Sequence, residues 1–179
     1  KKSLKGDFDC GGVLSYNMFS GEDVVGLNEG RPMVLRSQNC KFTLANFMRS
    51  CLMSAMATMR IGLDILNAEE PVKVNKICGH GGFFKTAEVG QRILSAAFSA
   101  PVSVLETAGE GGPYGMALLA AYMIRKTDGE SLEDYLDKVF ADAKEVTVTT
   151  TKDEIDGFTA YTERYRKALE AERAAISCS

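Results

Sequence analysis

The sequence is poor in the features that membrane proteins and nucleic-acid-binding proteins share. It contains no tryptophan and one histidine, and its 21 lysine and arginine residues are outnumbered by 24 acidic residues, for a net charge of −3. The basic residues are dispersed, which argues against a nucleic-acid surface. The longest apolar run, Met116 to Ile124, is far shorter than the roughly 18 residues of a membrane span. We therefore expect neither a nucleic acid nor a membrane as a partner.

The cysteines lack the spacing of a metal site or a disulfide framework. There are five, an odd number, and none forms a CxxC pair. With one histidine, a zinc site would need an unusual ligand set, so we predict no metal site in the chain. Reduced thiols and a cytoplasmic location are the expectation from this cysteine usage. Cys51 and Cys78 lie in apolar runs and are predicted to be small buried hydrophobic residues.

The composition is that of an ordinary globular domain, with 45% hydrophobic and 25% charged residues. We predict a single domain over residues 1–179, in which residues 1–40 are an irregular or extended lead-in and residues 41–179 hold an α/β core and the C-terminal helices. Val13–Tyr16 and Met33–Leu35 are short extended pieces of the lead-in, which is expected to pack against another segment. The chain does not start with methionine, so we expect it to be part of a longer protein.

Residues 43–66 form the strongest predicted helix, because apolar side chains recur there at helical spacing. The apolar positions are Leu44, Phe47, Met48, Cys51, Leu52, Ala55, Met56, Met59, Leu63 and Leu66. We interpret this methionine-rich stripe as core packing and place Asn46, Arg49 and Ser50 on the opposite, polar side. Pro71 is expected to separate this helix from the first strand.

Two successive units then repeat the order strand, glycine-rich loop, helix, in residues 72–94 and 101–124. Because the carboxyl ends of parallel strands meet at one edge of a sheet, we predict an α/β architecture with both loops at that edge. The helix after the second loop, from about Gly115 to Lys126, is apolar nearly all round and is predicted to be buried.

Two capping-box spacings, Ser131 with Asp134 and Thr151 with Glu154, predict two C-terminal helices. The first would bury Leu132, Tyr135, Leu136 and Val139, and the second, to about Ala175, would bury Phe158, Tyr161, Tyr165 and Leu169. The charged residues of the second helix, Glu172 among them, are predicted to form a solvated face. Residues 146–150 form either an edge strand or an extended connection.

The first glycine loop nearly matches the phosphate-binding motif G-x-x-x-x-G-K-[ST], with Gly79 and residues 85–86 correctly placed. Phe84 stands where the second glycine belongs, and its steric penalty argues against a true loop of that kind. The hypothesis that remains is a glycine-lined wall beside a nucleotide, which Gly81 and Gly82 would share with Gly79. The alternative is a tight turn that needs glycine only for its dihedral angles.

The polar residues of the two loops allow several roles. His80 has no evident partner, so we interpret it as structural or as a ligand contact rather than a general base. Lys85 is predicted at the start of a helix, where its charge opposes the helix dipole; this favours a phosphate contact, with a solvated lysine as the alternative. The second loop carries Gly109, Gly111 and Gly112, which allow close approach of a ligand or backbone. Glu106 either contacts a ligand or accepts hydrogen bonds from the loop.

Together these features resemble the C-terminal half of the FGGY carbohydrate kinases, the family of xylulokinase, ribulokinase and glycerol kinase. A strand ends in a glycine-rich turn, here Cys78 to Gly82, and a helix follows with a Q-I-L-like run, here Gln91 to Leu94. A short strand and a small-residue helix, Gly115 to Ala120, come next, and Leu14 to Glu22 is similar to a family segment that ends in S-G-E. The likeness covers most of residues 11–170 and is closest to a xylulokinase-like branch with GHGG in place of GGG.

The resemblance implies a ribonuclease-H-like, actin-like ATPase fold, here incomplete, with ATP or ADP and Mg²⁺ as cofactors and a ketopentose such as xylulose as substrate. It places the nucleotide beside Gly79, His80, Gly81, Gly82, Phe83 and Lys85, with a possible contribution from Glu106, Gly109, Gly111 and Gly112. A homodimer is a further partner state to test. The family's catalytic aspartate and sugar pocket lie before the matched region. No catalytic residue is therefore expected here, and the chain alone is expected to be inactive.

Two other functions remain open. A non-catalytic regulatory or scaffold domain would keep the fold without binding a nucleotide, and His80 in place of a glycine supports this alternative. An α/β oxidoreductase is disfavoured, because GHGG is not G-x-G-x-x-G and no acidic residue ends a strand about 20 residues further on. ADP binding separates the kinase from the scaffold domain, and preference for ADP over a dinucleotide separates the kinase from the oxidoreductase.

Overall fold

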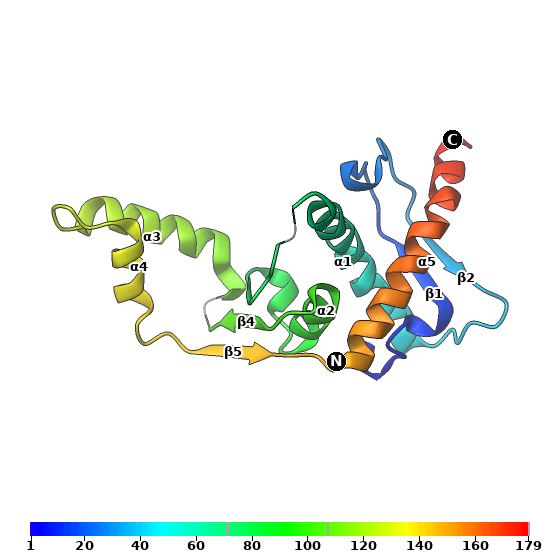
Figure 1. Cartoon of the computed structure of the whole chain (residues 1–179), viewed down its shortest axis with the longest axis horizontal. Helices are drawn as coiled ribbons and strands as arrows, with labels where there is room; N and C mark the ends of the chain where they lie inside the picture. Colours follow the sequence, from blue (N-terminus) through cyan, green and yellow to red (C-terminus); the bar gives the residue numbers. More distant parts are fainter. Residues whose placement is uncertain (71, 107, 179) are drawn as a thin grey trace.

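The computed structural model describes residues 1–70, 72–106 and 108–178 (Figure 1). In this part of the chain there are two small sheets. The first pairs β1 (Val13–Tyr16) with β2 (Met33–Arg36) in antiparallel register, and the second has the order β3 (Ile77–Gly79), β4 (Val102–Leu105), β5 (Glu145–Val148). The helices are α1 (Leu44–Glu69), α2 (Val89–Phe98), α3 (Gly111–Arg125), α4 (Leu132–Phe140) and α5 (Lys152–Ser177). None of these helices is long and apolar enough to cross a membrane.

The second sheet confirms the two predicted strand–loop–helix units. β4 lies between its neighbours, parallel to β3 and antiparallel to β5. Residues 145–148 are therefore an edge strand rather than a mere connection. Pro71, which was expected to separate α1 from β3, lies outside the described residues.

The main core forms where β1, α1, α2 and α5 meet. All four residues of β1 are buried, as are the aromatic residues predicted for α5. The Tyr161 hydroxyl donates to the backbone carbonyl of Ser50 at 3.1 Å, and the Tyr16 hydroxyl donates to the carbonyl of Tyr165 at 2.6 Å. The lead-in thus packs against α1 and α5, in agreement with the prediction.

The buried face of α1 is not the one that the apolar pattern predicts. Asn46, Arg49 and Ser50 are buried, whereas Leu44 is 61% exposed. Tertiary partners cause the difference: the Asn46 side chain accepts from the Asp7 N–H at 2.7 Å, and the Ser50 hydroxyl lies 2.6 Å from that of Ser15. Met48 and Met59 of the methionine-rich stripe reach solvent, whereas Met53, which the stripe does not include, is fully buried.

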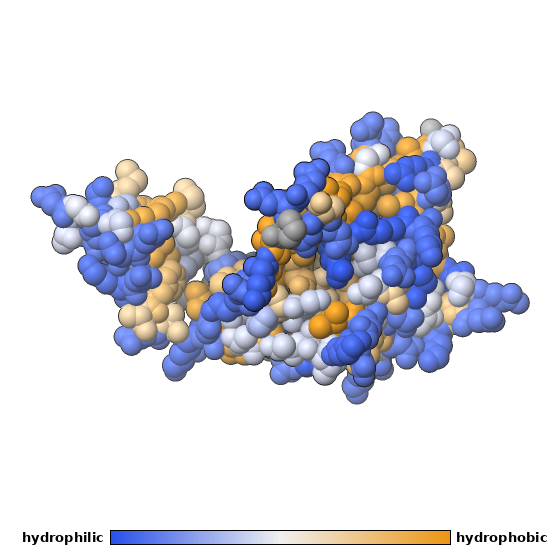
Figure 2. Space-filling model, in the orientation of Figure 1, coloured by the Kyte–Doolittle hydropathy of each residue, from blue (hydrophilic) through white to orange (hydrophobic). Residues whose placement is uncertain are grey.

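The two helices α3 and α4 form an arm that projects from the rest of the molecule (Figure 1). Neither helix contains a fully buried residue, and Met123 and Ile124 are 78% and 84% exposed, so the predictions of a buried helix and of a buried stripe on α4 are wrong. The cause is that α4 covers α3 on one side only, through the ring pairs Tyr114–Phe140 and Tyr122–Tyr135. Figure 2 shows apolar residues at the surface of this arm.

Three further side chains differ from expectation. Cys78 is exposed and Cys51 is half-buried, while Cys10 is the fully buried thiol, and burial raises its pKa to about 12. Glu172 is fully buried rather than solvated, because α5 turns it toward the lead-in, where it accepts from the Arg31 N–H at 2.5 Å. Local hydrophobicity does not report such long-range partners.

Candidate functional site

The carboxyl ends of β3 and β4 bring the two glycine loops into direct contact. The N–H of Gly81 donates to the carbonyl of Ala108 at 2.7 Å. A Cβ atom on Gly111 would lie 2.8 Å from the Cβ of His80, so the backbone of the second loop fits closely against that side chain. The parallel pairing of β3 with β4 explains this arrangement, because it places both loops at one sheet edge.

The positions in the two loops are occupied by glycine for different structural reasons. Gly81 has φ +94°, which side-chain-bearing residues rarely adopt. Gly79 lies under the ring of Phe84, where a Cβ would be 2.6 Å from ring carbons. By contrast, a Cβ on Gly82 or Gly112 would meet no described atom within 4 Å. The open wall of the site is therefore at Gly82 and Gly112, and Gly79 is covered.

The phenylalanine pair fills the space beneath the first loop. The rings of Phe83 and Phe84 meet edge to face with centroids 5.4 Å apart, and the carbonyl of Phe83 packs against Gly90 at the start of α2. Phe84 thus replaces the glycine of a phosphate-binding loop with a packed ring, which agrees with the conclusion that this is not such a loop.

Lys85 does not start a helix, in contrast to the prediction. The short 3₁₀ helix η4 (Gly82–Phe84) ends just before it, and α2 begins at Val89 after Glu88 adopts φ +67°. The helix-dipole argument for a phosphate contact at Lys85 is therefore wrong. The Lys85 side chain instead lies near Gly109 of the second loop, whose Cβ position would be 3.5 Å from Cε.

The second loop is shorter than predicted. Residues Ala108–Glu110 form a 3₁₀ turn, and α3 starts at Gly111 rather than near Gly115. Gly111 and Gly112 therefore occupy the first turn of a helix, where backbone N–H groups have no partner within the helix. Glu106 is exposed at the end of β4, and its N–H donates to the carbonyl of Lys144 at 3.3 Å.

A hollow of about 230 Å³ lies on the α2 side of these loops, lined by Phe84, Lys85, Glu88, Gln91, Val104 and Glu106 among others. Gln91, which was not predicted as a site residue, fixes its floor: the side-chain amide donates to the carbonyls of Val102 at 3.1 Å and Val146 at 2.8 Å. An amide on the mostly apolar buried face of a helix is the sequence signal that could have revealed it.

A second support fixes α2 against α5. The Arg92 guanidinium donates from Nε to Glu154 Oε1 at 2.9 Å and from Nη2 to Oε2 at 2.7 Å. The same carboxylate accepts from the Thr151 N–H at 3.0 Å in the predicted capping box. Since α2 follows the first loop directly, this ion pair fixes the position of that loop relative to the main core.

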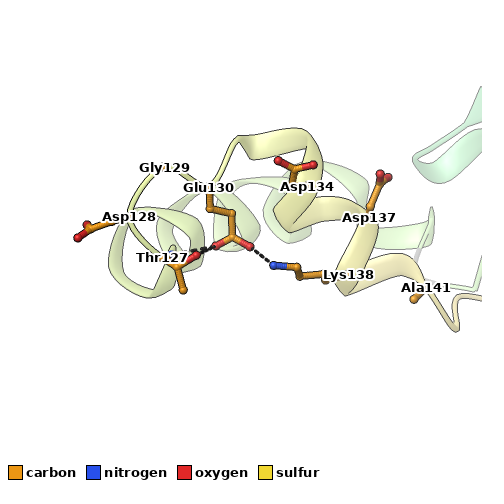
Figure 3. Close-up of a pocket in the computed structure, with 8 residues that line it drawn as sticks. All are labelled: Thr127, Asp128, Gly129, Glu130, Asp134, Asp137, Lys138 and Ala141. Carbon is orange, nitrogen blue, oxygen red and sulfur yellow. Dashed lines mark hydrogen bonds and ion pairs between the residues drawn. The ribbon is translucent and has the colours of Figure 1, made fainter.

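A larger hollow, of about 600 Å³, lies elsewhere, at the turn between α3 and α4 (Figure 3). Its central group, the Glu130 carboxylate, accepts from Lys138 Nζ at 2.6 Å and from the Thr127 N–H at 2.9 Å. These bonds hold the pKa of Glu130 below its ordinary value. The carboxylate thus closes the turn of the arm, and none of the predicted site residues lines this hollow.

A family comparison matches residues 1–124 to the C-terminal domain of the FGGY family of carbohydrate kinases. A search of curated proteins found no match to the chain.

Solved structures resemble the whole chain. Xylulose kinase from Rhodospirillum rubrum covers 95% of the chain with a TM-score of 0.65 and 16% identity, and Plasmodium falciparum glycerol kinase, solved with ADP, covers 96% with a TM-score of 0.69 and 17% identity. Xylulose kinase from Lactobacillus acidophilus covers 97%, with a TM-score of 0.69 and 13% identity. The chain spans only 32%, 32% and 34% of these proteins, about a third of their length. The predicted ribonuclease-H-like, actin-like ATPase fold is thereby confirmed.

Proposed function

This chain belongs to the FGGY family of carbohydrate kinases as its C-terminal domain, and we propose that residues 1–179 form the nucleotide side of an ATP-dependent sugar kinase. In this proposal ATP binds with Mg²⁺, and its γ-phosphate passes to a sugar hydroxyl, with a ketopentose such as xylulose as the substrate. The sugar pocket and the catalytic aspartate belong to another part of the protein, so the chain alone binds nucleotide without transferring phosphate.

The observation that carries this proposal is the pair of glycine loops held together at the ends of β3 and β4. Gly82 and Gly112 leave their sides of the loops open, so that a flat ligand can approach the backbone closely. The N–H groups of the first α3 turn favour negative charge, which suits a polyphosphate. His80 would border the nucleotide, and Lys85 would provide a positive charge near the second loop.

The remaining predicted residues take supporting roles in this proposal. Gly79 and Phe83 shape the first loop from beneath, and Glu106 lines the hollow beside it. The scaffold alternative rests on His80 alone. That side chain lies against Gly111 without filling the space over Gly82, which supports retention of nucleotide binding.

Mg·ADP titration of the ¹⁵N-labelled chain tests the proposal through the variant Gly82→Val. A Cβ atom at this position would meet no described atom within 4 Å, so the variant is expected to keep its free energy of unfolding within about 1 kcal/mol. The added methyl groups occupy the proposed nucleotide surface, so ADP affinity is expected to fall at least about tenfold. Amide shifts should be confined to the two loops.

Gly62→Ala is the matched control, because it adds a methyl group to another glycine with room for it, within α1 and outside both loops. It should leave ADP affinity unchanged. Dispersed amide signals that ignore Mg·ADP in the unmodified chain would favour the scaffold domain, and equal ADP binding by Gly82→Val would remove the open glycine wall from the proposal.

We also propose that the exposed stripe of α3 allows two copies of the chain to associate. Residues 111–124 carry no charge, and Met116, Leu119 and Met123 reach solvent at helical spacing. In sedimentation at rising concentration, Met123→Glu is expected to shift the chain toward the monomer, since it would bury a charge in the contact. Met59→Glu, at an exposed methionine of α1, should leave the association unchanged.

A further inference from the structure

A further hollow, the Phe19 hollow, has a lining that the nucleotide site does not explain. It measures about 370 Å³, within the range of small-molecule sites. Asn17, Phe19, Ser20 and Glu22 of the segment after β1 line it, together with Thr58 of α1 and Tyr165 of α5. None of these residues belongs to the glycine loops, and Figure 1 shows that the segment after β1 lies beside α1 and α5, away from β4 and β5.

The polar groups of the Phe19 hollow are mostly hydroxyls. Ser20, Ser54, Thr58 and Tyr165 each bring one. Burial raises the pKa of the Tyr165 hydroxyl to about 12, so it remains protonated at neutral pH, and it shares a hydrogen bond with the side chain of Ser54. The Asn17 amide donates to the carbonyl of Cys51 at 2.9 Å, which leaves its side-chain oxygen as an acceptor.

The charge of the hollow is negative. No lysine or arginine lines it, and within the described residues the Glu22 carboxylate forms no ion pair. An unpaired carboxylate repels a phosphate or another anion and accepts O–H donors. Phe19 lies at the same place with 86% of its surface exposed, and its ring supplies an apolar face.

From this combination we propose that the Phe19 hollow binds a neutral polyhydroxylated molecule, a polyol or free sugar, and not its phosphate. The hydroxyls, the amide oxygen and the Glu22 carboxylate exchange hydrogen bonds with the ligand's hydroxyls, while the ring of Phe19 packs on its C–H face. The site is independent of the nucleotide loops and does not rest on the proposed kinase activity.

Methyl and amide NMR of the full chain tests this with three probes: xylitol, ribose 5-phosphate and choline. Xylitol is expected to give saturable shifts at Met18 and Gly21, which line the hollow, with a dissociation constant on the order of 1–10 mM. Ribose 5-phosphate should bind at least about tenfold more weakly. An aromatic ring beside a carboxylate can also bind a quaternary ammonium cation, so choline is included as a probe; it should give smaller shifts than xylitol.

Variants locate the binding. Phe19→Ala and Thr58→Val are each expected to weaken xylitol binding about fivefold or more. Phe42→Ala, at an exposed phenylalanine outside the hollow, should leave it unchanged. Phe19 is so exposed that its replacement should not unfold the chain, which unchanged amide shifts elsewhere will verify. The proposal is overturned if xylitol gives no saturable shift, if the phosphate or choline binds more tightly, or if Phe42→Ala weakens binding as much as Phe19→Ala.

Discussion

Replacing Glu154 by alanine is expected to lower the free energy of unfolding by about 3 kcal/mol. The Glu154 side chain is 2% exposed and accepts two hydrogen bonds from Arg92 and one from the Thr151 N–H. Its loss leaves the Arg92 guanidinium without its partner, removes one of the two bonds of the α5 capping box and releases α2 from α5. Urea unfolding followed by circular dichroism measures the change.

Asp156→Ala is the matched control for this experiment. Asp156 lies two residues further along α5 and pairs with Lys152, but both side chains are mostly exposed, at 58% and 82%. Such a pair contributes little, so the control should change the free energy of unfolding by less than about 0.5 kcal/mol. Similar losses in the two variants would contradict a special role for the buried ion pair.

Alanine at the two mid-helix glycines, Gly62 and Gly157, is expected to have opposite effects. In α1, a Cβ on Gly62 would make an ordinary contact of 3.8 Å with Val24, so Gly62→Ala should stabilise the chain by about 0.5–1 kcal/mol. In α5, a Cβ on Gly157 would lie 2.5 Å from the Cβ and 2.7 Å from the carbonyl carbon of Phe8. Gly157→Ala should therefore destabilise it by about 2 kcal/mol, despite the better helix propensity of alanine.

The two variants can be compared directly, because both make the same chemical change in the interior of a 26-residue helix. In thermal unfolding, the Tm of Gly62→Ala should be higher than that of the unmodified chain, and the Tm of Gly157→Ala should be lower. If both variants gain stability, the lead-in does not approach α5 as closely as Phe8 indicates.

Local signals in the sequence predict much of this fold. The capping-box spacings at Ser131 and Thr151 mark helix starts correctly, because a cap depends on neighbours within one turn. The predicted aromatic face of α5 is also confirmed. The contact between the two glycine loops follows from the order of strands and helices, since parallel pairing fixes where strands end.

What the sequence could not predict depends on distant partners. Asn46 and Arg49 look solvated, but Asn46 bonds the backbone of Asp7, and Arg49 lies with its guanidinium 5.2 Å from the centre of the Phe8 ring. In the candidate site, Gly79 and Gly82 are equivalent in the sequence, yet only the position of the Phe84 ring makes one covered and the other open. The hydropathy of α3 shows that the helix is apolar. It does not show that α4 covers only one side and leaves the other exposed.

The contact of α5 with β1 has a consequence for synthesis of the chain. Tyr161 bonds the carbonyl of Ser15, 146 residues earlier, and β1 is buried on both sides in the finished fold. At about 5–20 residues per second, a ribosome needs about 7–30 s to reach Tyr161 after it has made Ser15. During that interval the first strand has no C-terminal helix to cover it. Nascent chains stalled before residue 152 should therefore be the ones that chaperones hold, and completion of α5 should release them.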